Sequence, residues 1–285
     1  MAIKGDIVVG IDGSPAARDA AAWALKDARH YGLPLTYVTV VPESASPDEK
    51  DTARQYLDVL ASDLRAFGPD VDFTTLVEVG DGAEILARMS QKARMIVIGK
   101  HVPHPVQAGR IGTISDGLPG HALSTVLVHK PRFDSWSDPE NHPSPHTRVV
   151  VGLDSSEYAG VAAIDAATVA RSLGVPLLVV VGTTSLGDVE KVREQIDLDM
   201  AWLRAEFPGL SVSAEFLEGE PADLLVDRSA DADLLVIGKR GLGRFASLRT
   251  QLGRTSAQVL PNSQCSVLLV PFRDDPLLAR RRTVG

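Results

Sequence analysis

Residues 234–256 read Leu-Leu-Val-Ile-Gly-Lys-Arg-Gly-Leu-Gly-Arg-Phe-Ala-Ser-Leu-Arg-Thr-Gln-Leu-Gly-Arg-Thr-Ser, and this stretch decides the fold that we expect. Its first four residues form an apolar run typical of a strand buried on both faces. The run ends at Gly238, and Gly241 and Gly243 follow in a loop that carries basic residues and no carboxylate. Gly253 then opens a predicted helix, whose unpaired N–H groups and dipole favour an anion. The pattern indicates a phosphate-binding loop, and a glycine-rich turn with a solvated basic surface is the alternative.

A second stretch of the same kind occurs at residues 96–113, where a predicted strand is followed by Gly99, a loop and Gly112-Thr113. Corresponding residues of the two copies are separated by 142 positions near the start, 139 in the middle and 141 near the end, as in Asp12 and Asp154, Gly99 and Gly238, and Gly112 and Gly253. Offsets this steady across five predicted strands indicate an internal repeat. The second copy is therefore three residues shorter around its second helix and two residues longer in its loop.

The length and composition agree with two globular domains. A chain of 285 residues suits two domains of about 100–150 residues each. Its hydrophobic content of 44% and charged content of 23% are ordinary for a soluble protein. The net charge of −8 argues against a general nucleic-acid surface, and no apolar run is long enough for a membrane span. The single cysteine, Cys265, fits a reducing compartment, so we expect a cytoplasmic protein without nucleic-acid or membrane partners.

The repeat also sets the domain boundaries. We predict one domain over residues 1–133 and a second over 148–273. The polar, proline-rich residues 134–147 are typical of a linker. Residues 274–285 are predicted to be a flexible tail whose arginines are solvated.

Strands that alternate with helices predict, in each domain, a parallel sheet with right-handed crossovers. Ligands bind such sheets beyond the carboxyl ends of the strands, where the strand order reverses. With the order 3-2-1-4-5, Asp12 would lie beside Gly99, and Asp154 beside Gly238. Each carboxylate would then bond a ribose or a base while the neighbouring loop holds phosphates. The alternative is that each aspartate only caps the turn that follows it.

Five motifs carry a resemblance to a known family: Val-Val-Gly-Ile-Asp-Gly-Ser at 8–14, Val-Val-Gly-Leu-Asp-Ser-Ser at 150–156, Gly219-Glu-Pro, Asp-Leu-Leu-Val-Ile-Gly-Lys-Arg-Gly at 233–241, and Cys265-Ser-Val-Leu-Leu-Val. With them, nearly the whole chain resembles a tandem universal stress protein. The resemblance implies two Rossmann-like (adenine nucleotide alpha hydrolase-like) domains, each a five-stranded parallel sheet of order 3-2-1-4-5 with helices on both faces. It also implies ATP binding, a role in survival under stress, homodimers, and dimer-like pairing of the two domains through their fifth strands.

The ATP-binding branch of that family carries G-x2-G-x9-G-[ST] after the fourth strand, and both copies depart from it. The first has Val102 in place of the second glycine. In the second, eleven residues separate Gly241 from Gly253, and Arg254 stands in place of Ser or Thr, although counting from Gly243 restores nine. The candidate nucleotide-binding residues are Asp12, Val40, Gly99, Gly112 and Thr113 in the first copy, and Asp154, Gly238, Gly241, Gly243, Gly253, Arg254 and Thr255 in the second.

Three functional classes follow from these observations. The first is a regulatory module in which ATP, with Mg²⁺, biases assembly or the choice of a protein partner. The second is a nucleotide-free interaction scaffold, which both motif departures favour. The third is a slow ATP hydrolase, although no residue near the loops stands out as a general base or nucleophile. His101-x2-His104 and His142-x3-His146 have metal-like spacing without further ligands, so we expect no metal centre.

Overall fold

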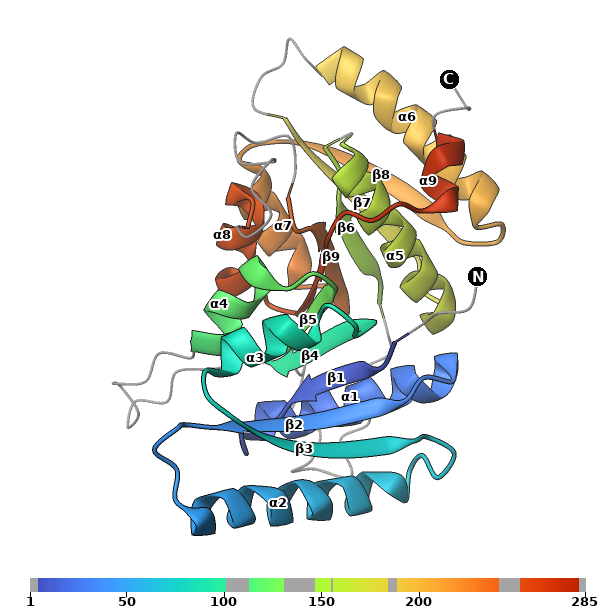
Figure 1. The fold of residues 1–285 in the computed structure, drawn as a ribbon. Helices are drawn as coiled ribbons and strands as arrows, with labels where there is room; N and C mark the ends of the chain where they lie inside the picture. The colour runs from blue at the N-terminus through green and yellow to red at the C-terminus, as the bar shows by residue number, and fades with distance from the viewer. Residues whose placement is uncertain are drawn as a thin grey trace. The chain divides into compact units, whose positions relative to one another are not determined.

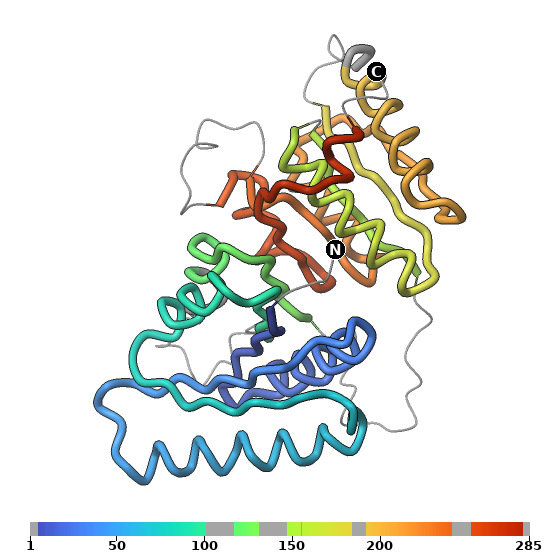
Figure 2. Tube along the Cα trace, turned by 45° about the vertical axis from the view of Figure 1, so that its right-hand side comes forward, coloured from blue at the N-terminus to red at the C-terminus, as the bar shows by residue number. Residues whose placement is uncertain are grey.

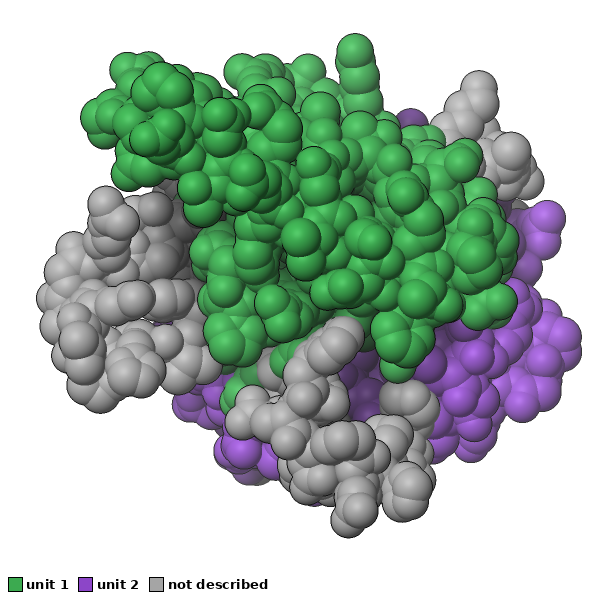
Figure 3. Space-filling view, turned by 90° about the horizontal axis from the view of Figure 1, so that it is seen from below, with its two compact units in different colours: residues 1–141 green, residues 142–285 purple. Residues whose placement is uncertain are grey.

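The computed structural model describes residues 5–100, 113–130, 147–154, 156–183, 189–240 and 252–281. Two compact units, coloured separately in Figure 3, make up the chain: residues 1–141 (unit 1) and residues 142–285 (unit 2). Strands alternate with helices in both units, as the repeat predicts.

Unit 1 contains a parallel sheet of order β3-β2-β1-β4-β5 (Figure 1). Its strands are β1 (Ile7–Gly10), β2 (Leu35–Val41), β3 (Phe73–Val79), β4 (Met95–Gly99) and β5 (Thr125–His129). Its helices are α1 (Pro15–Tyr31), α2 (Pro47–Arg65), α3 (Gly82–Met89) and α4 (Thr113–His121). Right-handed crossovers place α1 and α2 on one face and α3 and α4 on the other, because the chain reverses its direction across the sheet after β3. Helix α2 runs beside the edge strand β3 (Figures 1 and 2).

Unit 2 repeats this plan with the order β8-β7-β6-β9-β10. Its strands are β6 (Val149–Gly152), β7 (Leu177–Thr183), β8 (Val212–Glu218), β9 (Leu234–Gly238) and β10 (Ser266–Val270). Its helices are α5 (Glu157–Leu173), α6 (Val189–Glu206), α7 (Pro221–Ser229), α8 (Arg254–Asn262) and α9 (Pro276–Arg281). The predicted order 3-2-1-4-5 is therefore confirmed in both units.

Helix starts follow the local sequence. Ser14 caps α1 by accepting a hydrogen bond from the Ala17 N–H, and Pro15 occupies the first helical position. Ser46 and Glu49 form a reciprocal capping box at the start of α2. The first helix of each unit ends at a glycine with a left-handed backbone, which is a common helix C-terminus.

The sheet interiors contain the apolar runs that the sequence shows. In unit 1, Ile7 pairs with Leu35 on one side and Met95 on the other, and all three are buried. The edge strands β3 and β8 are mostly half-exposed. The continuous apolar strands of the sheet interior are thus covered on both faces, and the edge strands are more exposed.

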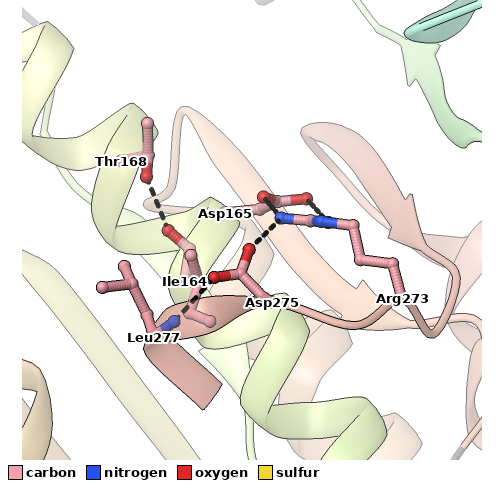
Figure 4. Close-up of polar contacts among 6 residues, drawn as sticks. All are labelled: Ile164, Asp165, Thr168, Arg273, Asp275 and Leu277. Carbon is pink, nitrogen blue, oxygen red and sulfur yellow. Dashed lines mark hydrogen bonds and ion pairs between the residues drawn. The ribbon is translucent and has the colours of Figure 1, made fainter. Parts of the chain in front are cut away.

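The segment after β10 corrects the prediction of a solvated tail. Residues 276–281 form α9, which packs on α5 and α6, with Leu278 buried and the Trp202 Nε1–H donating to the Leu277 carbonyl at 3.1 Å. Arg273 binds both carboxylate oxygens of Asp165 on α5, at 2.6 and 2.9 Å (Figure 4). The prediction is wrong for Arg281, whose side chain is only 9% exposed and pairs with Asp199 on α6, whereas the Arg280 side chain is 63% exposed. We call residues 273–281 the strap.

Candidate functional site

The site begins where neighbouring strands end. In unit 1, β1 and β4 pair in parallel, so that Gly10 stands opposite Ile98. In unit 2, β6 and β9 pair in the same way. The Asp12 turn therefore follows the strand next to the one that ends at Gly99. The same holds for the Asp154 turn and Gly238.

Both aspartates hold the turn that follows them. The Oδ1 atom of Asp12 accepts the Ser14 N–H at 2.9 Å, and that of Asp154 accepts the Ser156 N–H at 3.1 Å. Ser14 and Ser156 in turn cap α1 and α5. Both aspartates are exposed, and a carboxylate has about four acceptor positions, so capping the turn leaves chemical capacity for a ligand.

The glycines at the two strand ends have a packing role. A Cβ at Gly99 would lie 2.5 Å from the carbonyl carbon of Ala16, in the first turn of α1. At Gly238 it would lie 2.7 Å from the Arg240 carbonyl oxygen and 3.4 Å from the carbonyl carbon of Tyr158 in α5. Glycine at these two positions therefore lets neighbouring backbone atoms approach the end of each strand closely. This reason differs from the ligand contact that the sequence suggested for these two positions.

Hydrogen bonds fix the two ends of the unit 2 loop. The Lys239 N–H donates to the Val270 carbonyl at 2.7 Å, and the Lys239 carbonyl accepts the Gly253 N–H at 2.9 Å. The buried Ser256 hydroxyl donates to the Gly238 carbonyl at 2.8 Å. These contacts hold the start of α8 against the end of β9. The N-cap residue of α8, Gly253, has no side chain that could cap the helix, and the positive end of the helix dipole favours an anion.

Arg254 and Thr255 occupy the first turn of α8. The Arg254 side chain is 76% exposed, and its Nη2 lies 3.5 Å from a carboxylate oxygen of Glu220, which precedes α7. Thr255 is half-buried. An exposed ion pair of this kind contributes little to stability, so Arg254 can exchange Glu220 for another anion at small cost.

Lys239 is the site residue that the sequence alone did not single out. Its side chain is buried at the end of β9, and burial, with a smaller contribution from the charge of Arg240, lowers the pKa of the amine to about 8. At neutral pH the amine is mostly protonated, so that Lys239 carries a positive charge directly after β9. The corresponding Lys100 in unit 1 is half-buried. The signal in the sequence was the recurrence of Gly-Lys after both fourth strands.

The remaining candidates divide into described and undescribed positions. Val40 lies half-buried near the end of β2, two residues beyond Val38, whose carbonyl accepts the Ile11 N–H. Thr113 begins α4. Gly112, Gly241 and Gly243 lie outside the described residues, as do Val102 and the two histidine pairs. Within the described ranges, no cluster of three or more His, Cys, Asp or Glu side chains could hold a metal ion, and no helix is long and apolar enough to cross a membrane.

Fold and strand-end geometry together define the class: two tandem doubly wound α/β domains, each with an acidic turn beside a glycine-ended strand. The model of the universal stress protein family matches residues 5–130 and 145–271, and the chain belongs to that family.

The chain is also similar to individual proteins and solved structures. A universal stress protein of Mycobacterium tuberculosis is 25% identical over 95% of this chain and 96% of its own length. The crystal structure of a universal stress protein from Archaeoglobus fulgidus superposes with a TM-score of 0.71 at 19% identity, covering 95% of this chain and 97% of its own. A universal stress protein from the same organism, solved in complex with dAMP, covers 45% of this chain and 99% of its own at 26% identity, with a TM-score of 0.36.

Proposed function

We propose that this chain is an ATP-binding regulatory module, in which nucleotide bound at the strand ends of unit 2 biases assembly or the choice of a protein partner. The observation that carries the proposal is the convergence at one sheet edge of the Asp154 turn, the Lys239 cation and the start of α8, which no described side chain caps. A carboxylate and an anion-binding helix start are the two chemistries that a nucleotide needs. The complex with dAMP concerns another protein, and the support here comes from the residues of this chain.

The candidate residues of unit 2 suit the parts of ATP. Asp154 would bond the ribose or the base, and the amides of Gly253 and of the first turn of α8 would hold the phosphates, with Lys239 supplying charge. Mg²⁺ would bridge phosphate oxygens. Domain boundaries at 133 and 148, pairing through the fifth strands, homodimers and a cytoplasmic location are further parts of this proposal, supported by the family membership.

The test compares the two aspartates. Mass spectrometry of nucleotide released from the purified, denatured protein identifies a retained ligand, and calorimetry measures ATP affinity. Asp154→Ala should weaken binding by about 1–3 kcal/mol, the loss expected for a charge-assisted hydrogen bond. The matched variant Asp12→Ala removes the same turn contact from unit 1 and should leave the affinity of unit 2 unchanged. Equal affinity in wild type and Asp154→Ala, with lower stability in the variant, would mean that Asp154 only caps its turn.

The second candidate function is a nucleotide-free scaffold. The turn hydrogen bonds of both aspartates and the ion pair between Arg254 and Glu220 favour it, because each gives a candidate residue a structural partner. Absence of retained nucleotide, together with absence of binding heat in the folded wild type, would support the scaffold. Formation of ADP during the same incubation would instead indicate slow hydrolysis.

A further inference from the structure

The strap reaches the turn that holds Asp154. The guanidinium group of Arg281 in α9 binds the Asp199 carboxylate through Nε and Nη2, both at 2.6 Å. Its third nitrogen, Nη1, donates to the Ser156 carbonyl at 2.9 Å. The side chains of Arg281 and Asp199 are only 9% and 1% exposed. Arg281 therefore connects α6 to the start of α5 through a contact that is almost completely buried.

Ser156 also holds the Asp154 carboxylate. Its N–H donates to Asp154 Oδ1, its hydroxyl accepts the Ala159 N–H, and its carbonyl accepts the Gly160 N–H at 3.0 Å. The carbonyl that Arg281 binds belongs to the same residue whose N–H holds the Asp154 carboxylate. A shift of Ser156 would move Asp154 with it.

Unit 2 is shaped to accept this contact. A Cβ at Gly160 would lie 2.5 Å from Arg281 Nη1 and 2.6 Å from a methyl group of Leu278, so α5 leaves space for the strap at this position. The corresponding residue in unit 1, 142 positions earlier, is Arg18. Where unit 2 has the buried Asp199, the offsets of 142 and 139 lead to Leu57 and Leu60 in unit 1. The acid, the glycine and the arginine occur together only in unit 2, within the described residues.

A purely stabilising role does not explain why the contact between α9 and α6 is a buried ion pair and not an apolar pair. Apolar contacts of Leu278 and the hydrogen bond from Trp202 already fasten α9. Buried ion pairs add little to stability compared with apolar residues of similar volume. An apolar pair at these positions would lack the hydrogen bond to the Ser156 carbonyl, which is the one contact of the guanidinium group that leads toward Asp154.

We infer that Arg281 is a positioning residue for the nucleotide site of unit 2, which holds the Asp154 turn in its binding geometry through the Ser156 carbonyl. The inference rests on the proposed function. It adds that the affinity of unit 2 depends on a helix that is remote from the glycine loop in the sequence.

The experiment replaces two ion pairs of the strap, Arg281–Asp199 and Arg273–Asp165, one at a time by apolar residues. Arg281→Met alone would leave Asp199 buried without its partner and could unfold unit 2, so the test variant is Asp199→Leu with Arg281→Met. The matched control is Asp165→Leu with Arg273→Met, which removes another arginine–carboxylate pair of the strap and keeps the contact to Ser156. ATP affinity is measured by calorimetry, and hydrogen exchange at the amides of residues 156–160 is measured without nucleotide.

The test variant should bind ATP roughly tenfold more weakly than wild type, the order expected for one charge-assisted hydrogen bond. Its 156–160 amides should exchange faster, while the control changes neither quantity. Adding Asp154→Ala to both the test variant and the control should abolish the difference in ATP affinity between these two proteins, because the effect acts through Asp154. Equal ATP affinity in the test variant and wild type would overturn the inference and leave the proposed function intact. Absence of ATP binding in the wild type would overturn both.

Discussion

A single methyl group added at Gly99 tests how the strand end is built. The Cβ of Gly99→Ala would lie 2.5 Å from the carbonyl carbon of Ala16, 2.7 Å from its oxygen and 2.7 Å from the nitrogen of Ala17. These are backbone atoms that cannot rotate away, so either β4 or the first turn of α1 must shift. Overpacking of this kind costs about 1–3 kcal/mol, and we expect the upper half of that range.

Gly117→Ala is the matched control for this prediction. Its added Cβ would meet the Ala83 Cβ at 3.5 Å, an ordinary contact, inside α4. This variant should stabilise unit 1 by about 0.5–1 kcal/mol, because alanine loses less backbone entropy than glycine in a helix. The change in the free energy of unfolding for Gly238→Ala should lie between those of Gly99→Ala and Gly117→Ala, since only the Arg240 carbonyl oxygen would lie closer than 3 Å to the added Cβ.

Urea unfolding without nucleotide, followed by circular dichroism, gives the three free energies of unfolding. Two units need not unfold together, so amide hydrogen exchange in β1 and β4 locates the loss in unit 1. If Gly99→Ala unfolds at the same urea concentration as wild type and loses only nucleotide affinity, the packing argument is wrong and Gly99 serves the ligand.

Two further predictions concern the charges at the site. The Lys239 pKa of about 8 predicts that ATP affinity falls as the pH rises from 7 to 9, and calorimetry at both pH values should show a flatter response in Lys239→Met. The pKa of Lys239 in the folded state, about 8, lies below its ordinary value of 10.5. Between these two pH values the unfolded chain therefore binds more protons than the folded chain. The free energy of unfolding should therefore rise with pH from about 8 to 10.5 in wild type, and a rise of equal size in Lys239→Met urea titrations would contradict the assignment. Arg254→Ser should weaken ATP binding at low salt more than at high salt, while changing the free energy of unfolding by less than about 0.5 kcal/mol, because its partner Glu220 is also exposed. Tighter binding in that variant would show that Arg254 obstructs the site.

The repeat allowed the fold to be predicted because each element carried its own local signal. Ser14-Pro15 marked a helix start, and Leu234–Gly238 marked a doubly covered strand, while the strand order came from the family resemblance. The strap gave no such signal. Arg281 and Arg273 pair with acids 82 and 108 residues away, and no periodicity in the sequence relates residues at such separations.

The candidate site was predicted only in part for a similar reason. The adjacency of the Asp154 turn and Gly238 follows from topology alone. The burial of Lys239 depends on side-chain packing at the end of β9, which the motif does not encode. The packing role of Gly99 was also invisible, because the sequence does not show how closely α1 approaches β4.

The strap also affects how the protein is made. Ser156 and Asp199 leave the ribosome 125 and 82 residues before Arg281, the side chain that binds them both. Domains generally fold in order of synthesis. Unit 1 can therefore fold before Arg281, whose side chain is almost completely buried in unit 2, has been synthesised. Until Arg281 emerges, Asp199 must remain hydrated, because burying an unpaired carboxylate is costly. The second half of the chain should therefore depend on chaperones for longer during translation than the first half, which has the same strand order.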